Sequence, residues 1–147
     1  MSRTAPQSSG EAARERPPLP SGLVAFVKRD CPTCELVAPV LAAIADGAEL
    51  TVYTQDDPAF PAGLAPVDDT DLAMSWHHEI EAVPTLLRVE GGREVERALG
   101  WHRGEWEALT GRSGLGPDLP ELRPGCGSLS VDPSRAPELA IRFSGSK

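Results

Sequence analysis

The sequence predicts an α/β protein with a mixed, four-stranded sheet flanked by helices, in the order β-α-β-α-β-β-α. Near the start, an apolar run, a helical apolar pattern and a second apolar run follow one another. This succession is typical of two parallel strands joined by a right-handed helical crossover. Further along, two strand-like runs are separated by a Gly-Gly turn, which is typical of an antiparallel β-hairpin. Together these two observations predict the fold class.

The first half of the pattern is the crossover itself. Residues 23–27 form a continuous apolar run, as in a strand buried on both faces. A helix follows, with an apolar face at helical spacing and an end at Asp46-Gly47. Pro39 lies inside this helix and should kink it, because its nitrogen carries no hydrogen to donate. Residues 50–53 complete the crossover as a second strand.

A proline-rich stretch then separates the crossover from the hairpin. Residues 55–69 hold three prolines and a glycine, which predicts an exposed loop. This loop is either a tolerated surface insertion or a flap that selects substrates. A helix capped by Asp69 or Thr70 is expected to end near His78. The hairpin strands follow at 86–89 and 95–99.

A third helix ends the α/β pattern. A short helix carrying Trp106 and Leu109 should end before Gly111. His77 and His78 are expected to be solvated or to interact with a helix dipole rather than to bind a ligand. Trp101 and His102 follow Gly100 and either shape a binding surface or pack at its edge.

The chain divides into three regions. Residues 1–20 are rich in Ser, Pro, Arg and Glu and predict a disordered or loosely attached tail. Residues 21–111 form the α/β domain. Residues 112–147 form a C-terminal extension with a loop around Cys126 and a short helix after Asp132-Pro133.

Composition restricts the range of partners. A net charge of −8 argues against binding to nucleic acid, which requires a basic surface. No apolar run suits a signal peptide or a membrane span. We therefore expect a cytoplasmic monomer without nucleic-acid or membrane partners. In that reducing compartment, a close pair among three cysteines is more often catalytic, redox-sensing or metal-binding than structural.

Cys31 and Cys34 form such a pair, three residues apart where the first strand leads into the helix. At the start of a helix, free N–H groups and the helix dipole stabilise a thiolate on Cys31, while Cys34 lies one turn inward. Cys31 would attack a disulfide and Cys34 would resolve the mixed disulfide. Cys126 and the three histidines do not have zinc-ribbon spacing, so we expect no metal and no bound cofactor.

Two segments extend this pattern beyond the cysteines. The first reads Cys31-Pro-Thr-Cys-Glu-Leu-Val-Ala-Pro39, and the second reads Ile80-Glu-Ala-Val-Pro84-Thr-Leu-Leu. They resemble the active-site helix and the cis-proline element of the thioredoxin superfamily, a resemblance that covers about Gly22 to Thr110. The resemblance implies a thioredoxin-like fold and a thiol-disulfide oxidoreductase active in cell redox homeostasis.

The same resemblance implies roles for particular residues and partners. Pro84 would be cis and would face the disulfide, and the Val83 backbone would bind a substrate peptide, with Pro32 and Thr33 also at the substrate site. The substrate would be a protein or small-thiol disulfide. A reductase or a low-molecular-weight thiol would supply the electrons. The alternatives are a non-catalytic C-x-x-C module that binds metal or senses redox state, and a thioredoxin-like interaction scaffold.

The sequence departs from the family pattern in several places. Asp30 stands where a tryptophan is usual, and Ala25 stands where a buried acid is usual. Asp30 disfavours a thiolate on Cys31, whereas Lys28 and Arg29 favour it, and the sequence does not rank these effects. The Pro-Thr pair is closer to the glutaredoxin type, whereas the kinked helix and the hairpin look like thioredoxin.

Cys126 lies outside the resemblance, between two glycines that leave its sulfur accessible. It is either an incidental loop thiol or a third redox cysteine that exchanges with Cys31.

Overall fold

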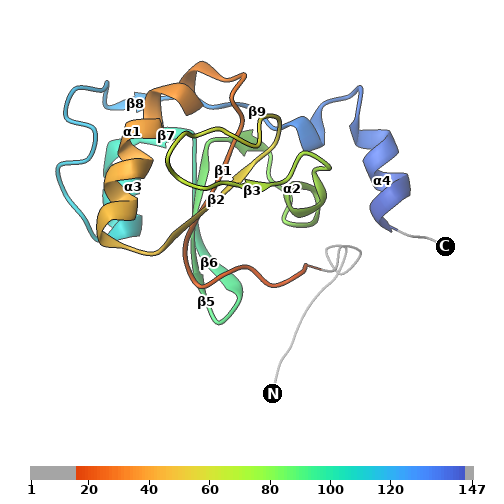
Figure 1. Ribbon diagram of the computed structural model, residues 1–147, viewed down its shortest axis with the longest axis horizontal. Helices are drawn as coiled ribbons and strands as arrows, with labels where there is room; N and C mark the ends of the chain where they lie inside the picture. The colour runs from red at the N-terminus through yellow and green to blue at the C-terminus, as the bar shows by residue number, and fades with distance from the viewer. Residues whose placement is uncertain (1–15, 145–147) are drawn as a thin grey trace.

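The computed structural model describes residues 16–144 and contains a five-stranded mixed sheet (Figure 1). The strand order is β3-β2-β1-β5-β6. Strands β1, β2 and β3 are parallel, whereas β5 is antiparallel to both β1 and β6. Their bounds are β1 Gly22–Val27, β2 Leu50–Thr54, β3 Val67–Asp68, β5 Thr85–Glu90 and β6 Arg93–Leu99. The α/β class is confirmed, but the prediction of four strands is wrong.

Strand β3 is the strand of the sheet that the sequence did not predict. Strand β3 lies within the stretch 55–69, which was expected to be an exposed loop, and it pairs with the end of β2. It is two exposed residues long and has no apolar pattern that a sequence analysis could detect. The stretch is also not exposed throughout, because Gln55 and Asp69 at its two ends are 1% exposed.

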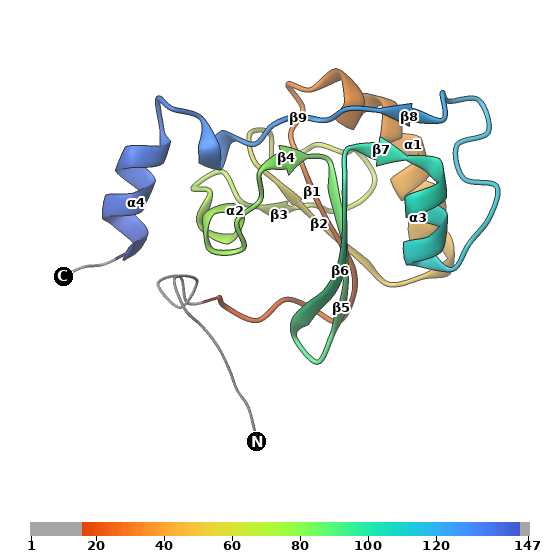
Figure 2. The same ribbon diagram turned by 180° about the vertical axis from the view of Figure 1, so that it is seen from behind.

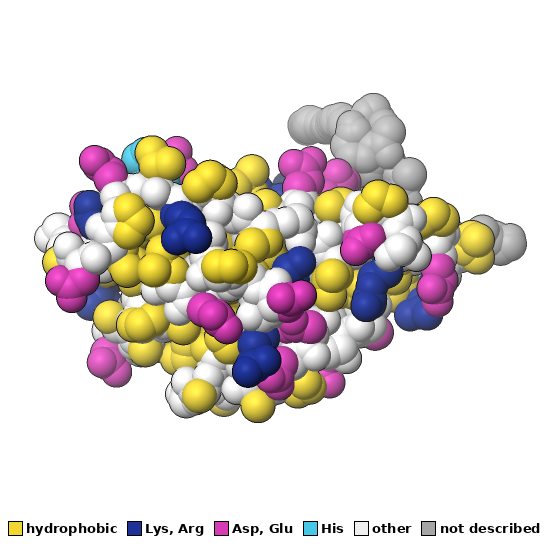
Figure 3. All heavy atoms as spheres, turned by 90° about the horizontal axis from the view of Figure 1, so that it is seen from above, with side chains coloured by type: hydrophobic (Ala, Val, Ile, Leu, Met, Phe, Trp, Pro, Cys, Tyr) yellow, Lys and Arg dark blue, Asp and Glu magenta, His cyan; other side chains and the backbone are white. Residues whose placement is uncertain are grey.

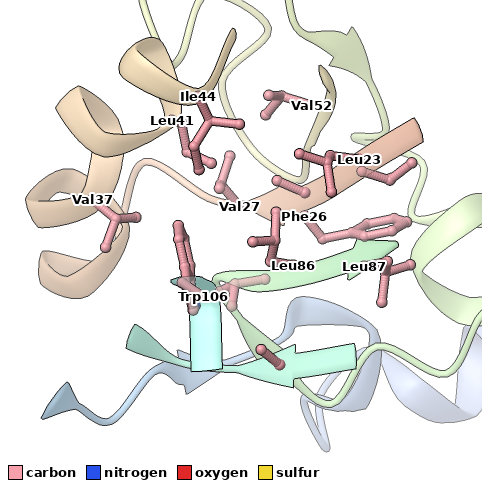
Figure 4. Packing of buried hydrophobic residues seen from close by; sticks show 14 of the residues in the cluster. Leu23, Phe26, Val27, Val37, Leu41, Ile44, Val52, Leu86, Leu87 and Trp106 are labelled. Carbon is pink, nitrogen blue, oxygen red and sulfur yellow. The ribbon is translucent and has the colours of Figure 1, made fainter. Parts of the chain in front are cut away.

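Strand β1 forms the centre of the core. Residues 24–27 are fully buried, as the continuous apolar run predicts. Helix α1 (Pro32–Gly47) covers one face of the sheet and includes Pro39, as predicted. Figure 4 shows Val37, Leu41 and Ile44 of this helix directed toward the sheet. Helix α3 (Arg103–Thr110) packs on the same side and ends at Gly111, whose φ of +72° suits a glycine.

The opposite side of the sheet carries two short helices, α2 (Ala73–His77) and α4 (Ala136–Ser144) (Figures 1 and 2). The Asp69 carboxylate accepts hydrogen bonds from the backbone N–H groups of Met74 and Ser75 at 2.9 and 3.0 Å. Asp69 thus caps the first turn of α2, although Leu72 is the residue that immediately precedes the helix. Leu139 of α4 packs against Leu72 and Trp76 in a small second cluster.

The C-terminal extension adds two short pairings that the sequence did not predict. Strand β8 (Leu122–Arg123) pairs with β7 (Trp101–His102), and β9 (Cys126–Gly127) pairs with β4 (Ala82–Val83). A 3₁₀ turn at Leu129–Val131 then leads toward α4. The extension therefore returns across the domain rather than leaving it.

The N-terminal side is described only from residue 16. Leu19 is 4% exposed, and its N–H donates to the Gly92 carbonyl at 3.1 Å. Residues 16–20 of the predicted tail thus contact the domain, whereas the prediction for residues 1–15 lies outside the described residues. Within residues 16–144, none of the helices has the length and apolar character needed to cross a membrane.

His78 is buried, so the expectation of a solvated ring is wrong for this residue. It is 3% exposed, and its Nε2 lies 2.8 Å from the Pro17 carbonyl oxygen. Its Nδ1 is buried without a hydrogen-bond partner. Burial lowers the pKa of His78 to about 4 because the charged ring is poorly solvated there.

The pKa of His78 predicts a loss of stability in mild acid. Between pH 6.5 and about 4, the unfolded chain binds a proton at this position that the folded protein does not bind. The free energy of unfolding should therefore fall as pH falls through this window. Urea denaturation at several pH values should show a shallower fall for His78→Gln than for the wild type. An equal dependence of the free energy of unfolding on pH in both proteins would contradict the assignment of this effect to His78.

A second prediction concerns Gln55, which connects the domain to the extension. Its Nε2 donates to Ser75 Oγ and Ser128 Oγ at 2.9 and 2.8 Å, and its Oε1 accepts from the Leu129 N–H at 2.9 Å. Gln55→Ala removes these three hydrogen bonds, including the acceptor of the Leu129 N–H, and should lower the free energy of unfolding by about 2–4 kcal/mol. Urea denaturation would measure the loss, with the exposed Asp118→Ala as control. A similar free energy of unfolding for Gln55→Ala and Asp118→Ala would contradict this prediction.

Candidate active site

Cys31 immediately precedes helix α1, in the position the sequence predicts. Its backbone is extended, with φ of −162° and ψ of 110°, and its sulfur accepts a hydrogen bond from the Cys34 N–H at 3.3 Å. The first N–H groups of a helix have no partners within the helix. Here they point at the Cys31 sulfur, which is the arrangement that favours a thiolate.

The loop before Cys31 is held by a residue that the sequence analysis missed. The Asp56 carboxylate accepts hydrogen bonds from the backbone N–H groups of Arg29 and Asp30 at 2.7 and 2.9 Å. β1 and β2 are parallel, so the loops that follow them start at the same edge of the sheet. An acidic residue just after β2 was the available signal.

Hydrogen bonds determine the charge state of the pair. The pKa of Cys31 is lowered to about 5, mainly by a hydrogen bond from the Cys34 thiol. Burial opposes this, and the Cys126 thiol and the N–H groups of Cys34 and Thr33 add to the lowering. Burial, together with the hydrogen bond to Cys31, raises the pKa of Cys34. The thiolate therefore resides on Cys31.

Val83 and Pro84 lie beside this sulfur. The Val83–Pro84 peptide bond is cis, so that prediction is confirmed. The Val83 carbonyl oxygen lies 3.6 Å from the Cys31 sulfur, close enough to accept a hydrogen bond when Cys31 is protonated. Both residues are buried.

Cys126 joins the pair from the extension. It lies opposite Val83 in the antiparallel pairing of β9 with β4, and it is half-buried. Its thiol is hydrogen-bonded to Cys31, and burial raises its own pKa. The three cysteines are thus neighbours, and all three are free thiols.

The remaining predicted site residues differ in their surroundings. Pro32 is exposed at the start of α1. Thr33 is 2% exposed, and its hydroxyl donates to the Pro124 carbonyl oxygen at 2.7 Å. Thr33 therefore contacts the extension of its own chain.

Trp101 and His102 pack within the domain rather than forming a surface for a ligand. Trp101 is 1% exposed, stacks edge-on against Trp106, and donates its Nε1–H to the Pro120 carbonyl oxygen. The His102 ring accepts a hydrogen bond from the Glu105 N–H and caps α3. Of the two alternatives for these residues, the structure favours packing.

The described part of the chain also has a hollow that lies away from the cysteines. A hollow of about 730 Å³, lined by Arg16, His78 and Arg97 among others, does not include any of the cysteines. Among residues 16–144, no group of three or more His, Cys, Asp or Glu side chains is arranged to hold a metal ion. Figure 3 shows hydrophobic, acidic and basic side chains intermixed on the upper face of the molecule.

The chain has no significant match to any protein-family model or to any curated protein. Functional conclusions therefore depend on the geometry of the cysteines.

The hydrogen bonds to Cys31 predict how its thiolate titrates. Absorbance near 240 nm should report ionisation of one thiol with a midpoint near pH 5 in the reduced protein, and Cys31→Ser should abolish it. Cys34→Ala removes the largest stabilising contribution, so the midpoint should rise. Cys126→Ala should raise it less. An unchanged midpoint in Cys34→Ala would contradict this account.

Proposed function

We propose that this protein is a thiol-disulfide oxidoreductase in which Cys31 is the nucleophile and Cys34 is the resolving cysteine. One observation carries the proposal. The Cys31 sulfur lies at the start of α1 and accepts a hydrogen bond from the Cys34 N–H at 3.3 Å, and its pKa is lowered to about 5. A low pKa makes a cysteine a thiolate at neutral pH, and the thiolate is the form that attacks disulfides.

The reaction has two exchanges. The Cys31 thiolate attacks one sulfur of a substrate disulfide, and the other sulfur leaves as a thiol after taking a proton. Cys34, as a thiolate, then attacks the Cys31 sulfur and releases the second substrate thiol. One substrate disulfide is reduced, and a Cys31–Cys34 disulfide forms. The proximity of Cys34 makes the second exchange effectively intramolecular.

The arrangement of the elements also supports membership of the thioredoxin superfamily, which we propose as the origin of this site. When the two-residue strands are set aside, the order up to the C-terminal extension is β1-α1-β2-α2-β5-β6-α3. A cis proline lies next to the C-x-x-C pair. Both features are those that the sequence resemblance implies.

The substrates we propose are protein or small-thiol disulfides, with a reductase or a low-molecular-weight thiol as electron donor. A cytoplasmic location, a monomeric state and a role in redox homeostasis stay predictions. One observation favours a second candidate, a redox sensor without turnover. Cys31 is only 2% exposed, whereas catalytic cysteines are usually partly exposed.

Insulin reduction by dithiothreitol separates these candidates. The wild type should accelerate the precipitation of the insulin B chain, and Cys31→Ser should lower the rate to that of dithiothreitol alone. Cys34→Ser should also lose turnover, because the mixed disulfide is no longer resolved by Cys34. A wild type that is oxidised reversibly but does not accelerate the assay would be a sensor. A wild type whose Cys31 does not react would be neither.

A further inference from the structure

Residues 124–128, which we call the Cys126 segment, are held across the edge of the domain that carries Cys31 (Figure 2). Three hydrogen bonds fix this segment. Thr33 Oγ1 donates to the Pro124 carbonyl at 2.7 Å, Lys28 Nζ donates to the Gly127 carbonyl at 2.8 Å, and the Ser128 N–H donates to the Glu81 carbonyl at 3.0 Å. Two of these partners, Lys28 and Thr33, flank Cys31 in the sequence.

The segment binds as an added strand would. Cys126 lies opposite Val83 and Gly127 lies opposite Ala82, in antiparallel register. Adding a strand to an exposed edge is a general way for a protein to bind an extended peptide, with the backbone supplying the hydrogen bonds. Here the chain fills that edge with its own residues, and the residue opposite Val83 is a cysteine.

The close approach depends on glycine. A Cβ atom added at Gly125 would lie 2.5 Å from the Val83 carbonyl oxygen, which is closer than van der Waals contact allows. Gly100 faces the segment from the other side, and a Cβ there would lie 2.9 Å from the Gly125 nitrogen. Only a segment with a glycine before Cys126 fits against Val83 in this register.

We propose that Cys126 is a second resolving cysteine, which forms a disulfide with Cys31 when the Cys126 segment is paired with β4. The inference rests on the proposed function, because it requires Cys31 to be the nucleophile. It is carried by the antiparallel pairing of Cys126 with Val83, whose carbonyl oxygen lies 3.6 Å from the Cys31 sulfur, and by the fit of Gly125.

Once the segment moves aside, the Cys31 thiolate attacks the disulfide of a reagent and forms a mixed disulfide with one half of it, while the other half leaves as a thiol after taking a proton. When the segment pairs again with β4, Cys126 attacks the Cys31 sulfur. The bond between the Cys31 and Cys126 sulfurs forms, the bond to the reagent sulfur breaks, and the reagent leaves as a thiol with the proton from Cys126. A low-molecular-weight thiol or a reductase returns both cysteines to the reduced state.

The test uses the full chain with Cys34→Ser and a small disulfide, bis(2-hydroxyethyl) disulfide, as oxidant. After trypsin digestion without reduction, Cys31 lies in the peptide of residues 30–88 and Cys126 in that of residues 113–135. A Cys31–Cys126 disulfide joins these two peptides, and intact-mass spectrometry should show the loss of two hydrogens without a bound reagent. In oxidised wild type, a fraction of the protein should show the same joined peptides beside the Cys31–Cys34 disulfide, with fragmentation placing the link on Cys31, which guards against misfolding of the variant.

Two other outcomes distinguish a failure of this inference from a failure of the proposed function. A stable reagent adduct on Cys31 with a free Cys126 would overturn this inference and leave the proposed function intact. Failure of Cys31 to react in the variant and in the wild type would overturn both. The double variant Cys34→Ser/Cys126→Ser should retain the adduct, which shows that Cys31 is reactive.

A matched pair of glycine variants tests whether the pairing places Cys126. Gly125→Ala should displace the segment and lower the rate of Cys31–Cys126 cross-linking by about tenfold or more, since the thiol loses its fixed position. A methyl group added at Gly127 meets no atom within 4 Å, so Gly127→Ala should cross-link like the parent. Equal rates in the two variants would overturn the role of the pairing.

Discussion

Val83 and Cys126 lie opposite each other in antiparallel strands, and this pairing joins three parts of the chain that are far apart in the sequence. Val83 leads through the cis peptide bond of Pro84 into β5, which pairs with β1, and β1 leads to Cys31. Cys126 belongs to the C-terminal extension, so its pairing with Val83 connects the extension to the domain. Because every link is a backbone contact or a short connection, a shift of either strand would change the surroundings of the Cys31 sulfur. The surroundings of the Cys31 sulfur therefore depend on the pairing of two short strands, β4 and β9, which are two residues long each.

The charge of Cys31 depends on hydrogen bonds more than on the charged side chains near it in the sequence. A buried thiolate is unfavourable unless donors replace water. Here the donors are the thiols of Cys34 and Cys126 and the first N–H groups of α1, while the Val83 carbonyl oxygen faces the same sulfur and suits the protonated form. Cys126 thus has an electrostatic effect on Cys31, whether or not the two sulfurs form a bond.

Access to Cys31 requires part of the structure to open. Strand β9 is two residues long, and Lys28 and Thr33 hold the segment by single hydrogen bonds. Segments with few buried apolar contacts open locally at a small fraction of the free energy of global unfolding. Ser128 at the end of the segment and Leu129 just after it are anchored by the buried Gln55. Residues 124–127 can therefore lift while the rest of the extension stays in place, which would expose Cys31, a residue that is 2% exposed when the segment is paired.

By itself the sequence determined β1, α1, the β5–β6 hairpin, α3 and the position of Cys31 at a helix start, because each depends on apolar periodicity or turn residues within a few positions. The resemblance of the segment around Pro84 also predicted its cis bond correctly. Strand β3, the burial of His78 and the support of the loop by Asp56 depended on contacts between distant residues and left no periodic signal. The same holds for Cys126, which lies 43 residues after Val83 and 95 residues after Cys31 in the sequence. Only the tertiary structure decided that it meets Cys31, because backbone hydrogen bonds between two-residue strands require neither a pattern nor proximity along the chain.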